Sequence, residues 1–310
     1  SGEGRFSLSG VDFSQTAKGM KLSILIVSWN TRDLLIKCIN SILRYPPSFD
    51  YEIIVVDNHS RDGSVEALVS LLGHNKRLQV IPSLRNLGFA KANNLAQKNS
   101  SGEFVLLLNP DTEVRPQALQ NLVEYLEGHP GVGIVGPKIL NPDGTVQPSV
   151  RRFPDIWSSL LVFSGLHRLW KPRWYLMEEF SYDQGAEVDQ VMGAALLTRR
   201  PLIAQLGFLD EKFWLWYEEV DFCKRVKEAG YQIKFYPKAE VMHLGAQSFS
   251  QLDVYERKRT VAKSLVYYFR KNGSFWQVAV ISICLPLVLA AAKFLDFLQK
   301  LFRFHLKPHG

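Results

Sequence analysis

This chain of 310 residues lacks the motifs of several common protein classes. Its three cysteines, Cys38, Cys223 and Cys284, are widely separated, have no C-x-x-C spacing and leave an odd count. A disulfide framework and a zinc cluster are therefore unsupported, and a reducing compartment is favoured. No G-x-G-x-x-G follows the first apolar run, and no G-x-x-x-x-G-K-S/T occurs anywhere. These absences argue against a dinucleotide oxidoreductase and a P-loop phosphotransferase.

The first 19 residues lack the apolar run of a signal peptide. Their serine- and glycine-rich sequence is typical of a flexible leader or an expression remnant, so we expect the folded chain to begin near Met20. The whole chain is 46% hydrophobic, which excludes a disordered protein. Its length suits one large α/β domain with an appendage, or two modest domains.

Positive charge exceeds negative charge, and the formal net charge is +7 at pH 7. Such an excess predicts an anionic partner, which can be a nucleic acid, a phosphorylated substrate or an anionic membrane surface. We expect no nucleic-acid partner, because the chain has no recognisable RNA- or DNA-binding module and its aromatic residues are not interleaved with basic ones. The sequence does not indicate an oligomeric state.

Strand-like and helix-like segments alternate over about a hundred residues from Leu22. Short, continuous, β-branched runs are typical of strands buried on both faces of a parallel sheet. Strands are predicted at 22–29, 51–58, 78–82 and 103–111, and helices at 30–43, 64–72 and 89–99. A further helix and strand are predicted at 218–231 and 231–243. The alternation predicts an α/β fold with an open, mostly parallel, doubly wound sheet.

Polar residues follow these strands at the edge where open parallel sheets bind their ligands. Asp57 and Asn58 end the second strand, and Asn109 and Asp111 follow the fourth. The pattern Asn109-x-Asp111 is a variant of the D-x-D arrangement, in which two side chains point toward one metal ion. Aspartate and asparagine also cap helices and close turns, and we favour that structural role for Asp62. For Asp57 and Asp111 we favour a functional role.

The stretch FWLWYEEVDFCKR, residues 213–225, places Glu218, Glu219 and Asp221 directly after a run of aromatic residues. One interpretation is an ordinary amphipathic helix whose charges face solvent. The other is a catalytic acid. Both can hold together, because acidic groups in the first turn also favour the helix dipole.

Seven segments of the chain resemble the family-2 glycosyltransferases of the GT-A fold. They are ILIVSWN, EIIVVDNHSRDGS, RNLGFAKANN, LLLNPDTEV, GAALLTRR, GFLDEKFWLWYEEVDFCKRVKEAGY and VMHLGAQS, in that order between Lys21 and Ser248. Within that family the chain is most similar to bacterial rhamnosyltransferases of cell-wall and O-antigen assembly. The resemblance implies transfer of a sugar from a nucleotide diphosphate donor with inversion at the anomeric carbon.

The resemblance also implies roles for particular residues. It places the catalytic base at Glu219, where the family more often has aspartate, with Glu218 and Asp221 as alternatives. A base of this kind removes the proton of the acceptor hydroxyl in a single displacement. The preceding aromatic residues could exclude water and raise a carboxyl pKa.

On the donor side, the resemblance implies a Mg²⁺ or Mn²⁺ ion held by Asp111 and His243. Asp57 corresponds to the acid that accepts a hydrogen bond from the pyrimidine base. The other residues expected at the nucleotide or the donor sugar are Asn58, Arg85, Asn86, Asn93, Asn109, Gly193 and Ala194. Gly88 is expected to allow a close backbone approach.

The C-terminal segment is apolar and then basic. Residues 275–292 carry no charge and would span about 27 Å as a helix, slightly under the roughly 30 Å of bilayer hydrocarbon. Pro286 is expected to kink or interrupt that helix, and basic residues flank both of its ends. Residues 293–307 read as a basic amphipathic helix. We favour a segment that dips into one leaflet, with a helical pair packed on the enzyme or on a second subunit as the alternative.

Together these interpretations predict three parts: a leader at 1–19, a GT-A domain at 20–265 and a helical membrane-association segment at 266–310. The expected activity is metal-dependent, inverting transfer of rhamnose from dTDP-rhamnose to a saccharide on polyprenyl diphosphate. The expected location is the cytoplasmic face of the bacterial inner membrane, where the protein is peripheral or monotopic and contacts the membrane through residues 270–307. Alternatives are a galactofuranosyl or other hexosyl transferase using a UDP- or dTDP-sugar, and a non-catalytic sugar- or nucleic-acid-binding protein.

Overall fold

The computed structural model describes residues 19–72, 75–245, 251 and 254–305, the last helix by its backbone alone from residue 295. The predicted leader up to residue 18 lies outside the described residues. So do Gln247 and Ser248, at the end of the last similar segment, and Lys307 of the basic C-terminal helix.

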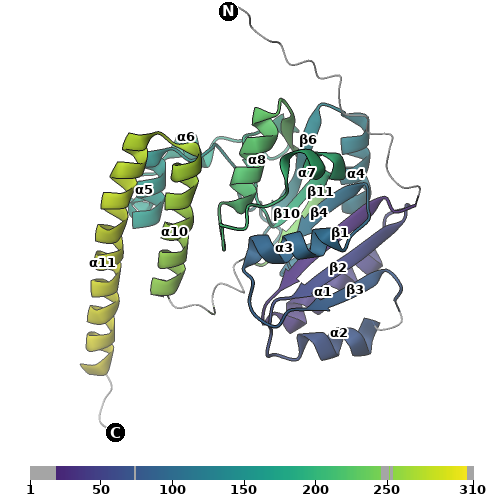
Figure 1. The fold of residues 1–310 in the computed structure, drawn as a ribbon, viewed down its shortest axis with the longest axis horizontal. Helices are drawn as coiled ribbons and strands as arrows, with labels where there is room; N and C mark the ends of the chain where they lie inside the picture. The colour runs from purple at the N-terminus through teal and green to yellow at the C-terminus, as the bar shows by residue number, and fades with distance from the viewer. Residues whose placement is uncertain (1–18, 73–74, 246–250, 252–253, 306–310) are drawn as a thin grey trace, which may run out of the picture.

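A central sheet of nine strands organises the molecule (Figure 1). Its strand order is β3-β2-β1-β4-β10-β6-β11-β5, with β8 paired to β11. The strands are β1 (Leu22–Ser28), β2 (Tyr51–Asp57), β3 (Leu78–Pro82), β4 (Phe104–Leu108), β5 (Thr112–Val114), β6 (Val132–Leu140), β8 (Ala186–Glu187), β10 (Ala195–Arg199) and β11 (Gln232–His243). A separate pair is formed by β7 (Val150–Arg151) and β9 (Gln190–Val191).

The sheet is mixed, and the expectation of a mostly parallel sheet was wrong. Four of its strand pairs are parallel and four are antiparallel. Strand β10 lies between β4 and β6 and runs antiparallel to both. Because β10 begins where β4 ends, the residues just before it lie at the carboxyl edge of the parallel strands: the Asn109 N–H donates to the Ala194 carbonyl oxygen (2.9 Å).

Helices cover both faces of the sheet. They are α1 (Arg32–Arg44), α2 (Ser64–Leu72), α3 (Phe89–Lys98), α4 (Ala118–Gly128), α7 (Arg200–Leu206) and α8 (Glu218–Glu228). Successive side chains of a strand point to opposite faces. Accordingly, Ile24 and Ile26 pack in a core with α1, α2 and α4, whereas Leu25 and Val27 pack in a second core with α3, α7 and α8. The alternation predicted for residues 22–99 is confirmed to within a residue or two at each helix.

Asp62 has the structural role that the sequence favoured. Its carboxylate accepts hydrogen bonds from the Arg32 N–H (2.8 Å) and from the Ser64 N–H (3.2 Å). It therefore joins the start of α1 to the start of α2.

A layer of helices stands beside the sheet (Figure 1). It contains α5 (Ile156–Ser164), the 3-10 helix η1 (Leu166–Arg168), α6 (Arg173–Leu176), α10 (Val254–Asn272) and α11 (Phe275–His305). Its core joins Phe163 of α5, Leu265 of α10 and Ile281 of α11 to Phe213 and Val220, which flank the start of α8. On its inner face, this layer is therefore a pair of helices, α10 and α11, packed on the enzyme, which was the alternative predicted from the sequence.

Two details of this layer differ from the expectations. The predicted boundary between residues 265 and 266 lies inside α10. Helix α11 runs through Pro286 without interruption, although proline removes one hydrogen bond of the helix and its ring crowds the preceding turn. Among the described residues, no helix is both long and apolar enough to cross a bilayer.

Candidate active site

A cleft of about 330 Å³ opens at the carboxyl edge of the parallel strands. Its walls come from the ends of β1, β2 and β4, the start of α3, the turn before β10, the turn before α8 and the end of β11. The lining residues are Val27, Trp29, Asn58, Asn86, Gly88, Phe89, Asn109, Pro110, Asp111, Arg151, Met192, Gly193, Ala194, Trp214, Leu215, Trp216, Glu218, Glu219 and His243. Open α/β sheets bind ligands at this edge.

Most of the predicted site residues meet in this cleft. Those that line it are Asn58, Asn86, Asn109, Asp111, Gly193, Ala194, Glu218, Glu219 and His243. Four others, Asp57, Arg85, Asn93 and Asp221, are not among its lining residues. Arg85 is exposed in the loop before α3. Asn93 is buried in α3, where its amide donates to the Phe89 carbonyl oxygen (3.0 Å) and so supports the helix start.

Asp57 lies directly before a residue of the cleft and retains one unsatisfied oxygen. It is 3% exposed, its Oδ2 accepts from the Ser60 N–H (3.0 Å), and its Oδ1 has no hydrogen-bond partner. A buried carboxylate oxygen without a donor is unfavourable. A ligand N–H would satisfy it.

Asn58 fixes the loop that follows β3. Its Oδ1 accepts from the Leu87 N–H (2.7 Å), and its amide nitrogen donates to Asn86 Oδ1 (3.0 Å). These bonds hold the start of α3 against the cleft.

The metal-binding pair predicted from the sequence comes together. His243 Nε2 lies 3.4 Å from Asp111 Oδ1, and both side chains are buried. Strand pairing produces this contact, because His243 at the end of β11 is opposite Thr112 of β5 and the Leu244 N–H donates to the Asp111 carbonyl oxygen (2.9 Å).

Gln147 sets the tautomer of His243. Its Oε1 lies 2.7 Å from His243 Nδ1, while its amide nitrogen donates to Asn141 Oδ1 (2.9 Å). An amide oxygen can only accept, so Nδ1 carries a proton, and the tautomer that this leaves for a neutral imidazole presents its lone pair at Nε2. His243 Nε2 has no hydrogen-bond partner, as suits a metal ligand.

These residues fit a divalent metal ion that takes its other ligands from elsewhere. Within the described ranges, no group of three or more His, Cys, Asp or Glu side chains could hold a metal. One carboxylate and one imidazole are nevertheless sufficient for Mg²⁺ or Mn²⁺ when substrate oxygens and water complete the shell. Asp111 and His243 are the residues that would hold it.

Glu218 and Glu219 form an acidic pair with different environments. Burial raises the pKa of Glu218 well above its usual value, and the neighbouring Glu219 carboxylate raises it further. Burial also raises the pKa of Glu219, but backbone N–H groups and the guanidinium of Arg151 oppose that shift. Glu219 is therefore the member of the pair that loses its proton more readily, which makes it the better candidate for a base.

Gly193 and Arg151 border Glu219. A Cβ atom added at Gly193 would lie 3.4 Å from Glu219 Cβ, so this small residue packs directly on the candidate base. Arg151, at the end of β7, lines the same cleft. The sequence analysis missed both Arg151 and Gln147, because they lie in a stretch without helical or strand periodicity and only the tertiary fold brings them to the site.

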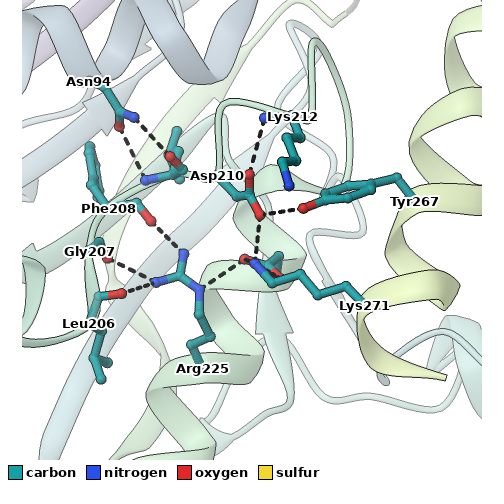
Figure 2. Close-up of polar contacts among 11 residues, drawn as sticks. Asn94, Leu206, Gly207, Phe208, Asp210, Lys212, Arg225, Tyr267 and Lys271 are labelled. Carbon is teal, nitrogen blue, oxygen red and sulfur yellow. Dashed lines mark hydrogen bonds and ion pairs between the residues drawn. The ribbon is translucent and has the colours of Figure 1, made fainter.

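Asp221 is not a candidate base, which corrects the sequence-based alternative. It is fully buried and binds Arg225 Nε (2.9 Å) and Lys271 Nζ (2.9 Å). Lys271 of α10 also pairs with Asp210 (2.7 Å), which accepts from the Tyr267 hydroxyl (2.9 Å), as Figure 2 shows. The Asp221 carboxylate is thus enclosed by two ion pairs and lies outside the lining of the cleft, where no acceptor hydroxyl would reach it.

The turn before α8 has an unusual backbone. Trp216 and Tyr217 adopt left-handed conformations, with φ values of 65° and 73°. Such residues cost roughly 1–3 kcal/mol each and persist only where surrounding contacts impose them. Ser264 of α10 supplies one such contact by donating to the Leu215 carbonyl oxygen (2.7 Å).

Gly88 supplies another contact to this turn. Its φ is +79°, and an added Cβ would lie 2.6 Å from Trp214 Cδ1. The adjacent Phe89 N–H donates to the Trp214 carbonyl oxygen (2.8 Å). The close approach that the sequence predicted at Gly88 is therefore made to Trp214 of the same chain.

Comparisons with known proteins agree with this geometry. The mannosyltransferase PcManGT from Pyrobaculum calidifontis, solved in complex with GDP-Man and Mn²⁺, superposes with a TM-score of 0.57 at 17% identity, over 93% of this chain and 83% of that one. This similarity shows a shared GT-A-like fold.

Relatives of known sequence are closer. The N-acetylglucosaminyl-diphospho-decaprenol L-rhamnosyltransferase of Mycobacterium tuberculosis is 31% identical over 215 residues, which are 63% of this chain and 67% of that protein. The O-antigen biosynthesis protein RfbC of Myxococcus xanthus is 29% identical over 72% of this chain and 17% of that protein. The family model described as Glycosyl transferase family 2 matches residues 23–204, more than half of the chain. The chain therefore belongs to glycosyl transferase family 2 and is a glycosyltransferase.

Proposed function

We propose that this glycosyltransferase moves rhamnose from dTDP-rhamnose, with inversion and with the aid of a divalent metal, onto a saccharide carried by polyprenyl diphosphate. Its 31% identity to a decaprenol-linked rhamnosyltransferase supports the donor sugar and the acceptor class. The observation that carries the proposal is the shared cleft: the Asp111–His243 pair and the Glu218–Glu219 pair both line it.

On the acceptor side, Glu219 accepts the proton of the attacking hydroxyl. Its raised pKa keeps the carboxylate basic enough to take that proton near neutral pH. The adjoining Gly193 and Ala194 leave room for a sugar ring beside the base. Trp214 and Trp216 line the same cleft, where they exclude water and offer faces for sugar stacking.

On the donor side, Asp111 and His243 would hold a divalent metal, and that metal would supply positive charge to stabilise the departing diphosphate. Asp57 accepts a hydrogen bond from the pyrimidine ring through its unsatisfied Oδ1. Asn58, Asn86 and Asn109 contact the nucleotide at the sheet edge. Arg85 is exposed in its loop and available to the diphosphate, and Asn93 acts indirectly by holding the start of α3.

The proposed acceptor places the enzyme at a membrane. A saccharide on polyprenyl diphosphate stays at the bilayer surface, and a nucleotide-sugar donor is supplied on the cytoplasmic face. We propose that the enzyme works there as a peripheral or monotopic protein. The segment 270–307 would contact the lipid, consistent with the exposed Phe275 and Trp276 at the start of α11.

Replacing Glu219 with glutamine tests the assigned base. Glu219→Gln should lower kcat by at least about 10³-fold while leaving donor affinity within about twofold, because the amide keeps the shape of the side chain but accepts no proton. Transfer is measured with a soluble acceptor analogue, and donor affinity by thermal shift. Glu211→Gln is the matched control, since Glu211 is an exposed carboxylate outside the cleft. Normal turnover in Glu219→Gln would remove Glu219 from the mechanism.

A further inference from the structure

Large exposed hydrophobic side chains are unevenly distributed over this molecule. Among the described residues there are fourteen of them, and ten belong to two segments, 157–174 and 275–294. These ten are Trp157, Leu166, Leu169, Trp170, Trp174, Phe275, Trp276, Ile283, Leu287 and Phe294. Single exposed apolar residues need no explanation, but a concentration in one layer indicates a binding surface.

The first segment belongs to the catalytic half of the chain and was not part of the membrane-association segment expected from the sequence. We name the exposed residues Trp157, Leu166, Leu169, Trp170 and Trp174 the tryptophan surface. Leu169 is 88% exposed and Trp170 is 79% exposed. Trp157 lies on α5 itself. Gly165 then ends α5 in a left-handed conformation (φ 85°), and the chain that follows it exposes Leu166, Leu169, Trp170 and Trp174.

The tryptophan surface and α11 belong to the same layer of helices (Figure 1). Ile156 and Phe163 of α5 share one core with Ile281 and Leu285 of α11. A flat partner that contacted the outer side of α11 would therefore lie next to α5 and to the segment that follows α5, up to Trp174.

The tryptophan surface has a basic surrounding. Residues 151–179 contain five Arg or Lys residues and three carboxylates, Asp155, Glu178 and Glu179. Asp155 is occupied at the start of α5, where it accepts from two backbone N–H groups. Glu178 pairs with both Lys171 (2.9 Å) and Arg173 (3.6 Å), which leaves an excess of positive charge.

Tryptophan mixed with arginine and lysine fits the interface of an anionic bilayer. Tryptophan favours the headgroup level, and each basic residue near an anionic surface adds to the attraction. Tryptophan and arginine are also common at protein–protein interfaces. A second copy of this chain would, however, bring the same excess of positive charge to the contact and repel it, whereas an anionic bilayer would attract it. The charge therefore favours lipid over a second copy of this chain.

This surface is connected to the active site by adjacent residues. Arg151 lines the cleft, and the guanidinium of Arg152 lies 5.9 Å from the ring centroid of Trp174. The Arg152 N–H also donates to the Tyr175 carbonyl oxygen (3.1 Å). The chain thus passes from the cleft to the tryptophan surface within a few residues.

We propose that the tryptophan surface docks on an anionic bilayer beside α11, so that the mouth of the cleft is held at the lipid surface. The benefit of this position rests on the proposed lipid-linked acceptor, but the docking itself does not. Docking brings an acceptor that diffuses in the membrane within reach of Glu219 without removing the acceptor from the lipid.

The test compares Leu169→Ser/Trp170→Ser with Leu84→Ser in the full chain. Leu84 is 95% exposed in the loop after β3, far from this layer in the sequence, and provides a matched loss of exposed leucine. Binding to phosphatidylglycerol vesicles and to phosphatidylcholine vesicles is measured by co-sedimentation. We expect the double variant to bind phosphatidylglycerol vesicles at least about tenfold more weakly, since two large apolar side chains no longer enter the interface. Leu84→Ser should bind as the unaltered protein does.

Three further results bear on the proposal. Binding by the unaltered protein should weaken on phosphatidylcholine and at high salt, because anionic charge contributes. Equal vesicle binding by the double variant and the unaltered protein would overturn the proposal. A dimer in light scattering that becomes a monomer in the double variant, without vesicle binding by either, would also overturn it and assign the surface to a second copy.

The outcomes separate this inference from the proposed function. Transfer to a water-soluble acceptor analogue should be unchanged in the double variant, since no substituted residue lines the cleft. Loss of vesicle binding with intact soluble transfer supports the docking surface. Normal vesicle binding in a protein with no transferase activity would instead count against the proposed function alone.

Discussion

At the scale of single residues, the acidic pair is the feature with the clearest consequences. Glu218 and Glu219 share one buried site, and backbone N–H groups oppose the rise in pKa of both, but only Glu219 is also opposed by a nearby cation, the guanidinium of Arg151. In many active sites, two neighbouring carboxyl groups have different pKa values because their environments differ. One of the two then acts as the acid or base, and the other does not.

We expect Arg151 to influence the pH dependence of the reaction through Glu219. Burial raises the pKa of Glu219, and Arg151 lowers it in opposition. Arg151→Gln removes that charge, so the pKa of Glu219 rises further and more of it is protonated at a given pH. The acid limb of the kcat/KM profile should move to higher pH. Arg151→Lys keeps the charge and should leave the limb in place, and an identical shift in both variants would contradict an electrostatic role.

Gln147 should govern metal affinity through His243. Gln147→Leu removes the acceptor that fixes Nδ1–H, so Nε2 no longer reliably presents a lone pair. Loss of such a supporting hydrogen bond typically weakens metal binding by about 10- to 100-fold. A Mn²⁺ titration followed by thermal shift measures the change. Gln147→Glu, which keeps the acceptor, should retain affinity, and unchanged affinity in Gln147→Leu would exclude this role.

The sequence identified the site residues that directly follow apolar strands, since their position is set by local structure. Asn58, Asn109 and Asp111 are of this kind. His243 and Glu219 needed the family resemblance, because a lone histidine or a helical glutamate has many structural uses. Asp221 was assigned wrongly, because its partner Lys271 lies 50 residues away in the sequence and on another helix.

At the scale of elements, helix α10 holds the start of α8 in place. Lys271 bridges Asp210 and Asp221, and Ser264 holds the turn that contains Leu215 (Figure 2 shows the ion pairs). These contacts lie on either side of the left-handed residues Trp216 and Tyr217, which directly precede Glu218 and Glu219 of the cleft.

Lys271→Met tests this connection. It leaves a buried carboxylate with one cation fewer and should lower the free energy of unfolding by roughly 1–3 kcal/mol. Urea unfolding monitored by circular dichroism measures the change. Lys212→Met is the matched control, because Lys212 bonds to Asp210 through its backbone N–H rather than its side chain. Equal destabilisation by the two variants would contradict the role of the Lys271 ammonium.

The same network has a predictable response to acid. Burial alone would raise the pKa of Asp210, but the hydrogen bonds from Lys271, the Lys212 N–H and the Tyr267 hydroxyl outweigh it and leave the pKa lowered. A carboxyl with a lowered folded-state pKa stabilises the fold while it is ionised. That stability is present at neutral pH and is lost as the pH falls below about 4.

The parallel half of the sheet was predictable, and the antiparallel strands were not. Strands β1 to β4 and helices α1 to α3 can be predicted from the spacing of their apolar residues and from the short connections between them. Strand β10 inserts between β4 and β6 from a distant part of the sequence, so no local pattern indicates its direction. The packing of α5, α10 and α11 was likewise uncertain, because the sequence of an apolar helix is the same whether the helix contacts lipid or protein.

At the scale of the whole molecule, donor binding should stabilise the fold by mass action. A panel of nucleotide sugars is measured by thermal shift with Mn²⁺ or Mg²⁺ present. We expect dTDP-rhamnose to raise the melting temperature the most, and to do so only with a metal. A larger shift with a UDP-hexose would replace rhamnose as the proposed donor sugar, and Asp111→Asn should abolish the metal-dependent part.

Helix α10 also limits how this enzyme can be shortened for practical use. Its apolar C-terminal neighbour invites trimming to obtain a protein that is easier to purify and crystallise. Cutting before Lys271 would remove an ammonium that partners Asp210 and Asp221, and cutting before Ser264 would release the turn at Leu215. A trimmed enzyme should therefore end beyond Asn272. It should also carry polar substitutions on α5 and α10 at the positions that pack against Ile281 and Leu285 in the full chain, because those positions would become exposed.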